Sequence, residues 1–309
     1  MLLRELEYLA ALARERHFAR AAAACHVSQP SLSAAIRRLE HDLGVPIVQR
    51  GRRFAGLTPE GERVLRWAHR ILADAEALRQ DLSAMRDGLT GTLRLGAIPT
   101  ALTAASLLTT PLCAGHPRVR VSLESVSSPQ VARLLSEFEM DVALTYLEDE
   151  TLTGMRTIPL YEERYLLLTP DDGTYADRDA VTWAEVATLP LCLLSPRMRN
   201  RRILDELFAA EGAVPVPAVE TDTVGALYAH IATHQWSTVI AHAWLQTFGV
   251  PDGMRIIPMR GQPRRPRIGL VLAERDFEPA LIRALLDVAG RVDLRGQLDT
   301  LVKRHLQRR

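Results

Sequence analysis

One segment, residues 58–88, constrains the fold more than any other part of the sequence. It opens with Thr58-Pro59-Glu60, which supplies a hydroxyl that can cap a helix, a proline suited to the first helical turn, and an early acid. Apolar residues then recur at helical spacing until Gly88, a residue that favours a helix end. The pattern predicts one helix running to about Asp87, which divides the chain into a part before it and a part after it.

The apolar residues of this helix are spaced alternately by four and by three positions. They are Val64, Ala68, Ile71, Ala75, Leu78, Leu82 and Met85. Such a heptad seam is typical of helices that pair along one side, so we expect it to join two copies of the chain. The alternative is that the helix packs on its own domain.

Composition excludes several classes of protein. The 309 residues are 47% hydrophobic and 24% charged, which suits globular cores and is too apolar for a disordered chain. Mean hydropathy is −0.02, and no apolar run reaches the roughly 18–20 residues that cross a bilayer. The first residues, MLLRELEYLA, do not resemble a signal peptide, and three widely separated cysteines do not suggest a disulfide framework or a cysteine zinc site. We therefore expect a cytoplasmic protein without a membrane partner.

Charge is distributed unevenly along the chain. Residues 1–58 hold nine arginines against five acidic residues, a net charge of +4, whereas the whole chain carries +1. The remainder therefore carries −3. A basic N-terminal segment of this size fits a nucleic-acid partner.

Residues 1–43 show helical periodicity throughout. Helices are predicted over 18–24 and 31–43, with His26-Val27-Ser28-Gln29-Pro30 as the turn between them. Residues 46–57 read as a short β-hairpin with arginines at its tip. Two short helices joined by a tight turn form a helix-turn-helix hypothesis, for which the alternative is a helical subdomain with solvated arginines.

A recognition helix needs a slim N-terminal turn with hydrogen-bonding side chains to meet base edges, and basic groups beyond it to meet phosphates. The residues expected near bases are Ser28, Gln29, Pro30, Ser31 and Ser33. The residues expected near phosphates are Arg37 and Arg38 on the helix, and Arg50, Arg52 and Arg53 in the hairpin.

After residue 90, short apolar strands alternate with helical patterns. Strands are predicted at 92–98, 119–124, 141–146, 165–168, 191–194, 237–241 and 268–273, and helices near 101–113, 129–138, 200–211, 223–234 and 278–290. Alternation of this kind implies an α/β fold with parallel sheets covered by helices.

The run AAAACHVSQPSLSAAIRRLEHDLGVPIVQR, followed by RRFAGLTPEGE, resembles the winged helix-turn-helix of LysR-type transcriptional regulators. The resemblance implies a winged helix-turn-helix over 1–58, a linker helix and hinge over 59–90, and a two-lobed effector domain over 91–309 similar to periplasmic binding proteins. Lobe I would comprise about 91–161 and 267–309, and lobe II about 162–266. The sequence departs from the family at Ala34 and Ala35, where polar groove contacts are common, and at His17, where a capping serine is common.

The resemblance also implies partners. Members bind interrupted inverted repeats near promoters as a dimer or a dimer of dimers, respond to a small-molecule effector, and act with RNA polymerase.

Small ligands of two-lobed α/β modules bind where strands end and helices begin, and helix N-termini favour anions there. Positions of this kind, several of which match effector contacts in the family, are Thr100, Ser127, Ser128, Thr145, Ser195 and Arg197. Hydroxyl groups beside an arginine suit a small carboxylate or another small anion. The alternatives are that the hydroxyls only cap helices, and that Arg197, with its neighbouring arginines, forms a solvated helix face.

Trp236 stands where many relatives have a glycine-rich turn, so we expect its indole to narrow the cleft; the alternative is packing at a lobe interface. We expect no metal site at His230, His234 and His242, because no HExxH pattern accompanies them, and no cofactor. No GxSxG motif, P-loop or nucleophile–base pair suggests an enzyme. The alternative functions are an enzyme or a small-molecule binding protein that uses the α/β domain, with the helical N-terminus as a dimerisation arm.

Overall fold

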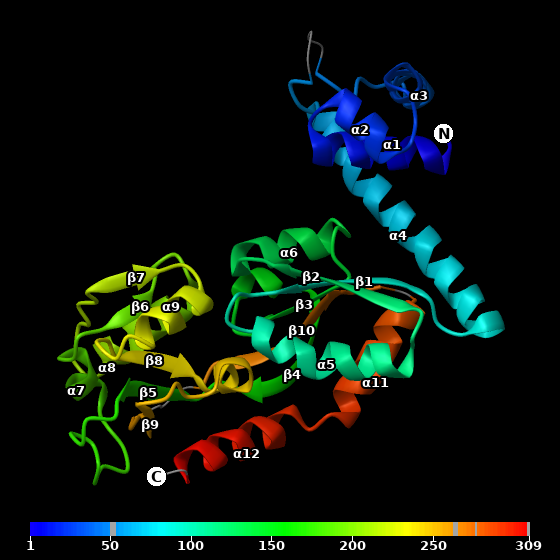
Figure 1. Cartoon of the computed structure of the whole chain (residues 1–309). Coiled ribbons are helices and arrows are strands. Elements are labelled where there is room, and N and C mark those ends of the chain that lie inside the picture. The colour runs from blue at the N-terminus through cyan, green and yellow to red at the C-terminus, as the bar shows by residue number, and fades with distance from the viewer. Residues whose placement is uncertain (50–53, 262–264, 276, 308–309) are drawn as a thin grey trace.

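The computed structural model describes residues 1–49, 54–261, 265–275 and 277–307, and it begins with a small helical domain (Figure 1). Its helices are α1 (Leu3–Glu15), α2 (Phe18–Ala24) and α3 (Gln29–Leu43). Leu9, Leu32 and Leu39 are fully buried at the centre of this domain. The predicted helix over 18–24 is confirmed, and α3 begins two residues earlier than predicted because Ser28 caps it directly before Gln29.

Local capping explains where these helices begin and end. The imidazole Nδ1 of His17 accepts a hydrogen bond from the backbone N–H of Ala19 at 3.2 Å, so histidine caps α2 in place of the serine common in the family. Gly44 ends α3 with a φ of 69°, a left-handed conformation that glycine adopts without steric cost.

A long helix, α4 (Pro59–Asp87), leads away from the helical domain as predicted (Figure 1). The Thr58 hydroxyl oxygen accepts a hydrogen bond from the N–H of Gly61 at 2.9 Å and donates its own proton to the carbonyl of Pro46 at 2.6 Å. A Cβ atom on Gly61 would lie 2.1 Å from the carbonyl oxygen of Ile47, so only glycine fits this close approach. The helix start is thereby locked against the base of the preceding hairpin.

Lobe I contains a five-stranded sheet in the order β2-β1-β3-β10-β4. The strands are β1 (Gly91–Ala97), β2 (Val119–Ser125), β3 (Val142–Tyr146), β4 (Met155–Glu162) and β10 (Arg267–Ala273). Helix α6 (Ser128–Ser136) covers one face, whereas α5 (Leu102–Gly115) and α11 (Ala280–Arg291) cover the other (Figure 1); a short 3₁₀ helix, η1 (Glu150–Leu152), precedes β4.

Lobe II contains two small sheets. The strands β5 (Tyr165–Pro170), β8 (Thr238–Ala241) and β9 (Met254–Pro258) form one, and β6 (Cys192–Leu194) with β7 (Val219–Thr221) form the other. The helices of this lobe are α7 (Trp183–Ala187), α8 (Arg199–Ala210), α9 (Val224–Ile231), η2 (His242–Trp244) and α10 (Leu245–Phe248). None of the helices in the described ranges combines the length and apolar character that crossing a bilayer requires.

The seven predicted strands are present, but the expectation of parallel sheets is only half right. Strand β1 pairs in parallel with β2 and β3, and β6 with β7. Strand β10 is antiparallel to β3 and β4, and β5 is antiparallel to β8 and β9. Strand β10 is antiparallel to β4 because the chain leaves lobe I after β4 and re-enters it at β10 in the reverse direction. The pattern also missed β4, β7, β9, α7, α10 and the last helix, α12 (Leu294–Leu306).

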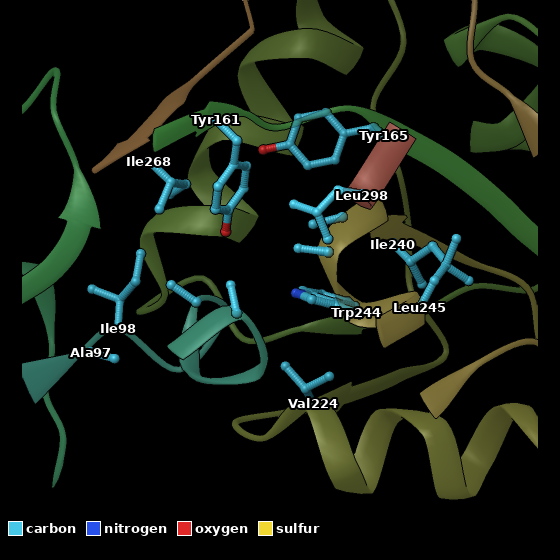
Figure 2. Packing of buried hydrophobic residues seen from close by; sticks show 14 of the residues in the cluster. Ala97, Ile98, Tyr161, Tyr165, Val224, Ile240, Trp244, Leu245, Ile268 and Leu298 are labelled. Carbon is cyan, nitrogen blue, oxygen red and sulfur yellow. The ribbon is translucent and has the colours of Figure 1, made fainter. Parts of the chain in front are cut away.

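The lobes share a continuous hydrophobic core where the chain crosses between them (Figure 2). Trp244 of lobe II is fully buried there, and its indole N–H donates to the carbonyl oxygen of Thr100 in lobe I at 3.0 Å. The two crossing segments lie side by side, since the N–H of Glu163 donates to the carbonyl of Pro266 at 2.8 Å. Helix α12 packs against β4 of lobe I and β9 of lobe II, so it also spans the junction.

Candidate DNA-binding surface and effector cleft

The N-terminus of α3 has a slim, polar and exposed surface. The Ser28 hydroxyl accepts the backbone N–H of Ser31 at 3.3 Å and lies 2.8 Å from the Ser31 hydroxyl. Gln29 and Pro30 point to solvent, while Leu32 is buried on the opposite side. The geometry allows close approach to a groove, with the exposed side chain of Gln29 and the hydrogen-bonded hydroxyls of Ser28 and Ser31 at its surface.

The two arginines of α3 differ in their contacts. Arg37 is exposed and forms no ion pair among the described residues. Arg38 contacts the buried carboxylate of Glu5 through Nε at 3.3 Å, while its side chain stays 62% exposed. The second oxygen of Glu5 accepts the N–H of Leu2 at 2.9 Å, so Arg38 joins α3 to the start of α1.

A groove of about 710 Å³ separates α3 from the base of the hairpin and is lined in part by Ser33 and Arg37. Val48 and Leu57 form an antiparallel bridge at that base. The hairpin arginines Arg50, Arg52 and Arg53 lie outside the described residues. The structure therefore brings Ser33 and Arg37 to one groove and leaves the hairpin tip as a sequence-based expectation.

The predicted heptad seam of α4 divides into two halves. Ala68 is fully buried in the core of the helical domain, and Val64 and Ile71 pack against the same core. Ala68 is therefore covered by its own domain, because apolar spacing identifies a buried face without identifying what covers it. Val64 and Ile71 keep part of their surface exposed, so their role in dimerisation stays a prediction. Leu78 and Leu82 are 61% and 53% exposed, so the second half presents an apolar face.

Two further seam residues continue this division. Ala75, at the middle of α4, is half-buried. Met85, near its end, is 83% exposed. The most exposed part of the apolar seam therefore extends from about the middle of α4 to its C-terminal end.

A cleft of about 820 Å³ lies between the lobes. Five of the predicted effector residues line it: Thr100, Ser127 and Ser128 from lobe I, and Ser195 and Arg197 from lobe II. They meet because the helices α6 and α8 start at its two sides. Within the described ranges, no side chain caps the first turn of α8, so that turn offers backbone N–H groups to an anion.

Thr145 and Trp236 are not among the described residues that line the cleft, and both expectations are corrected. Side chains alternate along a strand, so Tyr146, which lines the cleft, forces Thr145 to the other face of β3. The residue after Trp236 pairs in parallel with Leu191, directly before β6, whereas the cleft lies after the end of β6 near Ser195. Trp236 packs against the main core instead.

Several buried polar atoms at the cleft have no hydrogen-bond partner in the described part of the chain. They are Thr100 Oγ1, Ser128 Oγ, Asn200 Oδ1 and Arg199 Nε. Buried polar groups in proteins are normally paired, so these atoms indicate a polar ligand or ordered water. The sequence pattern singled out neither Asn200 nor Arg199 as a ligand contact. The sequence feature that indicates both residues is that they begin a helix, α8, which follows the buried strand β6.

The arginines of this region differ in role. Arg197 and Arg202 line the cleft and are exposed. Arg201 instead is buried, and its guanidinium donates to Asp205 at 2.8 Å, to Glu220 at 2.7 Å and to the Leu194 carbonyl at 2.8 Å. Arg201 therefore holds α8 to β6 and β7, while its neighbours give the cleft a positive rim. No group of three His, Cys, Asp or Glu residues in the described ranges is arranged to hold a metal ion.

Comparison with models of known protein families shows to which family the chain is related. The profile of the LysR substrate binding domain matches residues 86–293, and that of the bacterial regulatory helix-turn-helix protein, lysR family, matches residues 3–62. The chain belongs to the LysR family. Its family consists of transcriptional regulators rather than enzymes.

Individual LysR-family relatives give the same relationship. The chain is 34% identical over 197 residues to the DNA-binding transcriptional dual regulator OxyR of Escherichia coli, and the match spans 63% of this chain and 64% of that protein. It is 32% identical over 278 residues, 88% of each chain, to the probable hydrogen peroxide-inducible genes activator of Streptomyces viridosporus.

Solved structures of LysR-family proteins share the fold. A full-length variant of OxyR from Pseudomonas aeruginosa superimposes with a TM-score of 0.77 at 25% identity, covering 96% of this chain and 97% of the other. CbnR complexed with its target DNA superimposes with a TM-score of 0.66 at 21% identity, covering 94% of this chain and 99% of the other, and shows likeness of fold. The architecture expected from the sequence, a helix-turn-helix domain followed by a two-lobed α/β domain, is confirmed.

Proposed function

We propose that this chain is a ligand-responsive transcriptional regulator that binds promoter inverted repeats as a dimer or a dimer of dimers and acts with RNA polymerase. The observation that carries the proposal is the exposed start of α3, where Ser28, Gln29 and Ser31 present hydrogen-bonding groups on a narrow helix end. Arg37 stands two turns along the same helix, at the distance where a recognition helix meets the phosphate backbone.

The DNA proposal is tested by the affinity of the full chain for the duplex upstream of its own gene, measured by fluorescence anisotropy at several salt concentrations. Gln29→Ala is expected to reduce discrimination between this duplex and a random one by about 1–3 kcal/mol. Arg37→Ala is expected to weaken binding to both duplexes and to reduce the salt slope by about one. Arg295→Ala, at an exposed position of α12, is the control for the loss of a positive charge. An unchanged salt slope for Arg37→Ala would remove it from the interface.

The hairpin belongs to the same proposal. Arg50, Arg52 and Arg53 would add phosphate contacts from the wing, as the family resemblance implies. Replacing Arg52 and Arg53 by alanine together is expected to weaken binding to every duplex. If both affinity and salt slope stay unchanged, the wing does not contact DNA.

The second half of the proposal is that the interlobe cleft binds a small carboxylate or another small anion. Its support is the combination of an uncapped helix start, an exposed Arg197 and the hydroxyls of Thr100 and Ser128, which are unpaired within the described ranges. Helix N-termini and guanidinium groups favour negative charge, and unpaired buried hydroxyls offer further hydrogen bonds to a bound molecule.

A panel of small carboxylates, followed by calorimetry on the full chain, tests this assignment. Thr100→Val is expected to weaken binding about tenfold, because it removes one buried hydrogen bond at constant side-chain shape. Thr145→Val is the matched control, since Thr145 is equally buried, has a hydroxyl without a partner among the described residues, and faces away from the cleft. Equal losses in both variants, or no loss in Thr100→Val, would reject Thr100 as a contact.

The names of the relatives raise hydrogen peroxide as a second candidate signal. Peroxide sensing by a thiol needs an accessible thiolate. Cys192 is buried in β6, where burial raises its pKa to about 11, and burial also raises the pKa of Cys25 in the helical domain. Cys113, on α5, is half-buried, and all three thiols are free.

We infer from these thiols that a peroxide response would not depend on oxidation of Cys25 or Cys192. DNA affinity measured with and without hydrogen peroxide, for the wild type and for a variant with Cys25 and Cys192 replaced by serine, tests this. A peroxide response that disappears in this variant would overturn the inference.

A further inference from the structure

A carboxyl group without an assigned role is sealed between the lobes. Glu163, in the crossing between β4 and β5, is 0% exposed. Its Oε2 accepts hydrogen bonds from the hydroxyls of Tyr146 in lobe I and Tyr165 in lobe II, both at 2.9 Å. Its Oε1 has no partner among the described residues. Burying an ionisable group costs free energy, so the burial of Glu163 at the junction of the lobes indicates that this carboxyl has a function.

One of the two tyrosines connects this carboxyl to the cleft. Asn200, at the start of α8, lines the cleft, and its Nδ2 donates to the Tyr146 hydroxyl oxygen at 3.3 Å. Tyr146 also lines the cleft. Burial, together with the adjacent Glu163, raises the pKa of Tyr146 well above its usual value, so this hydroxyl keeps its proton.

The directions of the hydrogen bonds that link Glu163, Tyr146 and Asn200 constrain one another. An ionised carboxylate only accepts, so the single proton of Tyr146 is committed to Glu163. The oxygen of Tyr146 can then only accept from Asn200, which must turn its NH₂ group toward the tyrosine. The Oδ1 of Asn200 is left as a buried acceptor without a partner in the described part of the chain.

We propose that Glu163 is a positioning residue which, through Tyr146, orients the amide of Asn200 so that the wall of the cleft accepts a hydrogen bond. The effector class that fits is a small anion that also carries a hydrogen-bond donor, such as a hydroxy acid. The naming of this class rests on the proposed function of the cleft, whereas the orientation of the amide does not.

Protonation of Glu163 reverses the direction of the hydrogen bonds that link it through Tyr146 to Asn200. A neutral carboxyl can donate to Tyr146, whose proton is then free to point at Asn200, and the amide turns its oxygen toward the tyrosine. Burial raises the pKa of Glu163 to about 7, and the hydrogen bonds from the two tyrosines oppose that rise.

Other titratable or charged groups surround Glu163. They are Tyr161 on β4, Glu148 after β3, Arg164 beside it in the chain, and His242 of η2, whose ring packs edge-on against Tyr161 at 5.8 Å (Figure 2 shows Tyr161 beside Tyr165). Burial lowers the pKa of His242 to about 3, so of His242 and Glu163 it is Glu163 that changes charge near pH 7.

The chain offers a direct spectroscopic test, because Asn200 is the only asparagine in the sequence. Labelling the full protein with ¹⁵N-asparagine gives a single side-chain NH₂ pair. In the wild type this pair is expected to shift with pH around a midpoint near 7. Tyr146→Phe and Glu163→Gln are expected to abolish that titration.

Tyr161→Phe is the matched control. Tyr161 is a buried tyrosine near the same carboxyl, and its hydroxyl has no hydrogen-bond partner among the described residues. We expect this variant to keep the titration of the Asn200 amide. A wild-type resonance that does not move between pH 5.5 and pH 8.5, or one that titrates alike in Tyr146→Phe, would overturn the proposal, and the wild-type measurement stands even where a variant fails to fold.

The ligand class is tested with two acids that differ by one hydroxyl, lactate and propionate, by calorimetry at pH 8. The wild type and Tyr161→Phe are expected to favour lactate by about tenfold, the cost of leaving one buried acceptor unpaired, and Tyr146→Phe to lose the preference. Equal affinities in the wild type would refute the hydroxy-acid class. If neither acid binds the wild type, the carboxylate effector assignment fails, whereas the asparagine resonance still decides the role of Glu163.

Discussion

Replacing Glu163 by glutamine is expected to change how the stability of the effector domain depends on pH. The carboxyl has a pKa of about 7 in the folded chain and 4.5 as its reference value, so the folded state holds the proton more tightly. The contribution of Glu163 to the free energy of unfolding is therefore fully present below pH 4.5 and decreases as the pH rises through 7. The difference between the two pKa values corresponds to about 3 kcal/mol, of which roughly 2–3 kcal/mol falls between pH 5 and pH 8. Glutamine does not titrate, so the variant lacks this loss.

Urea unfolding of both proteins at pH 5, 6, 7 and 8 measures the effect. Tryptophan fluorescence reports on lobe II, which contains the buried Trp183 and Trp244. The free energy of unfolding of Glu163→Gln relative to the wild type is expected to increase by roughly 2–3 kcal/mol from pH 5 to pH 8, because the other titrating groups cancel in the difference. Glu124→Gln, at an exposed position of β2, controls for removing a negative charge. A difference that stays flat across this range would show that Glu163 is not buried as a titrating carboxyl.

Three other perturbations follow from the same structure. Burial lowers the pKa of His242 to about 3, so its contribution to the free energy of unfolding is present above pH 6.5 and decreases below it. Between pH 7 and pH 5, the free energy of unfolding measured in urea is therefore expected to fall by about 2 kcal/mol less in His242→Gln than in the wild type. Replacing Leu78 and Leu82 together by glutamate is expected to weaken self-association at least tenfold in sedimentation equilibrium, and an unchanged dimer would exclude this face of α4. Gly61→Ala is expected to lower the free energy of unfolding of the helical domain by about 3 kcal/mol, because its Cβ would meet the Ile47 carbonyl; a loss below about 0.5 kcal/mol in thermal unfolding would contradict that contact.

The helical domain was predictable because its determinants are local. The caps at Ser28 and Thr58 and the left-handed Gly44 are set by residues within one turn, and the apolar spacing of α3 identifies its buried face. The same local logic fails for Arg38, which the sequence assigns to phosphate contact and which also contacts Glu5, 33 positions earlier in the chain.

The effector domain shows where local patterns stop. The cleft residues Thr100, Ser128 and Ser195 were found because strand ends and helix starts are visible in sequence. Thr145 was misplaced because a pattern locates the end of a strand more easily than the face on which each side chain lies, and a shift of one residue reverses that face. Trp236 was misplaced because the direction of β8 relative to β6 is a property of the folded sheet.

The position of Glu163 explains why a ligand in the cleft could bear on the relation between the lobes. Tyr146 belongs to lobe I and Asn200 to lobe II, so the hydrogen bond between them spans the cleft wall. A ligand shifts an equilibrium only by the difference in its affinity for the two arrangements, and a contact to Asn200 supplies such a difference.

Among the described residues, in contrast, the linker helix forms hydrogen bonds with lobe I and none with lobe II. The Asp81 carboxylate on α4 accepts the backbone N–H of Ala280 and the guanidinium of Arg283, both at 3.1 Å. A movement of lobe II relative to lobe I therefore leaves α4 in place on its own subunit. For such a movement to reach α3, it must change the contacts that lobe II makes with another copy of the chain, so DNA binding by an isolated monomer should be insensitive to the ligand while binding by the oligomer responds to it.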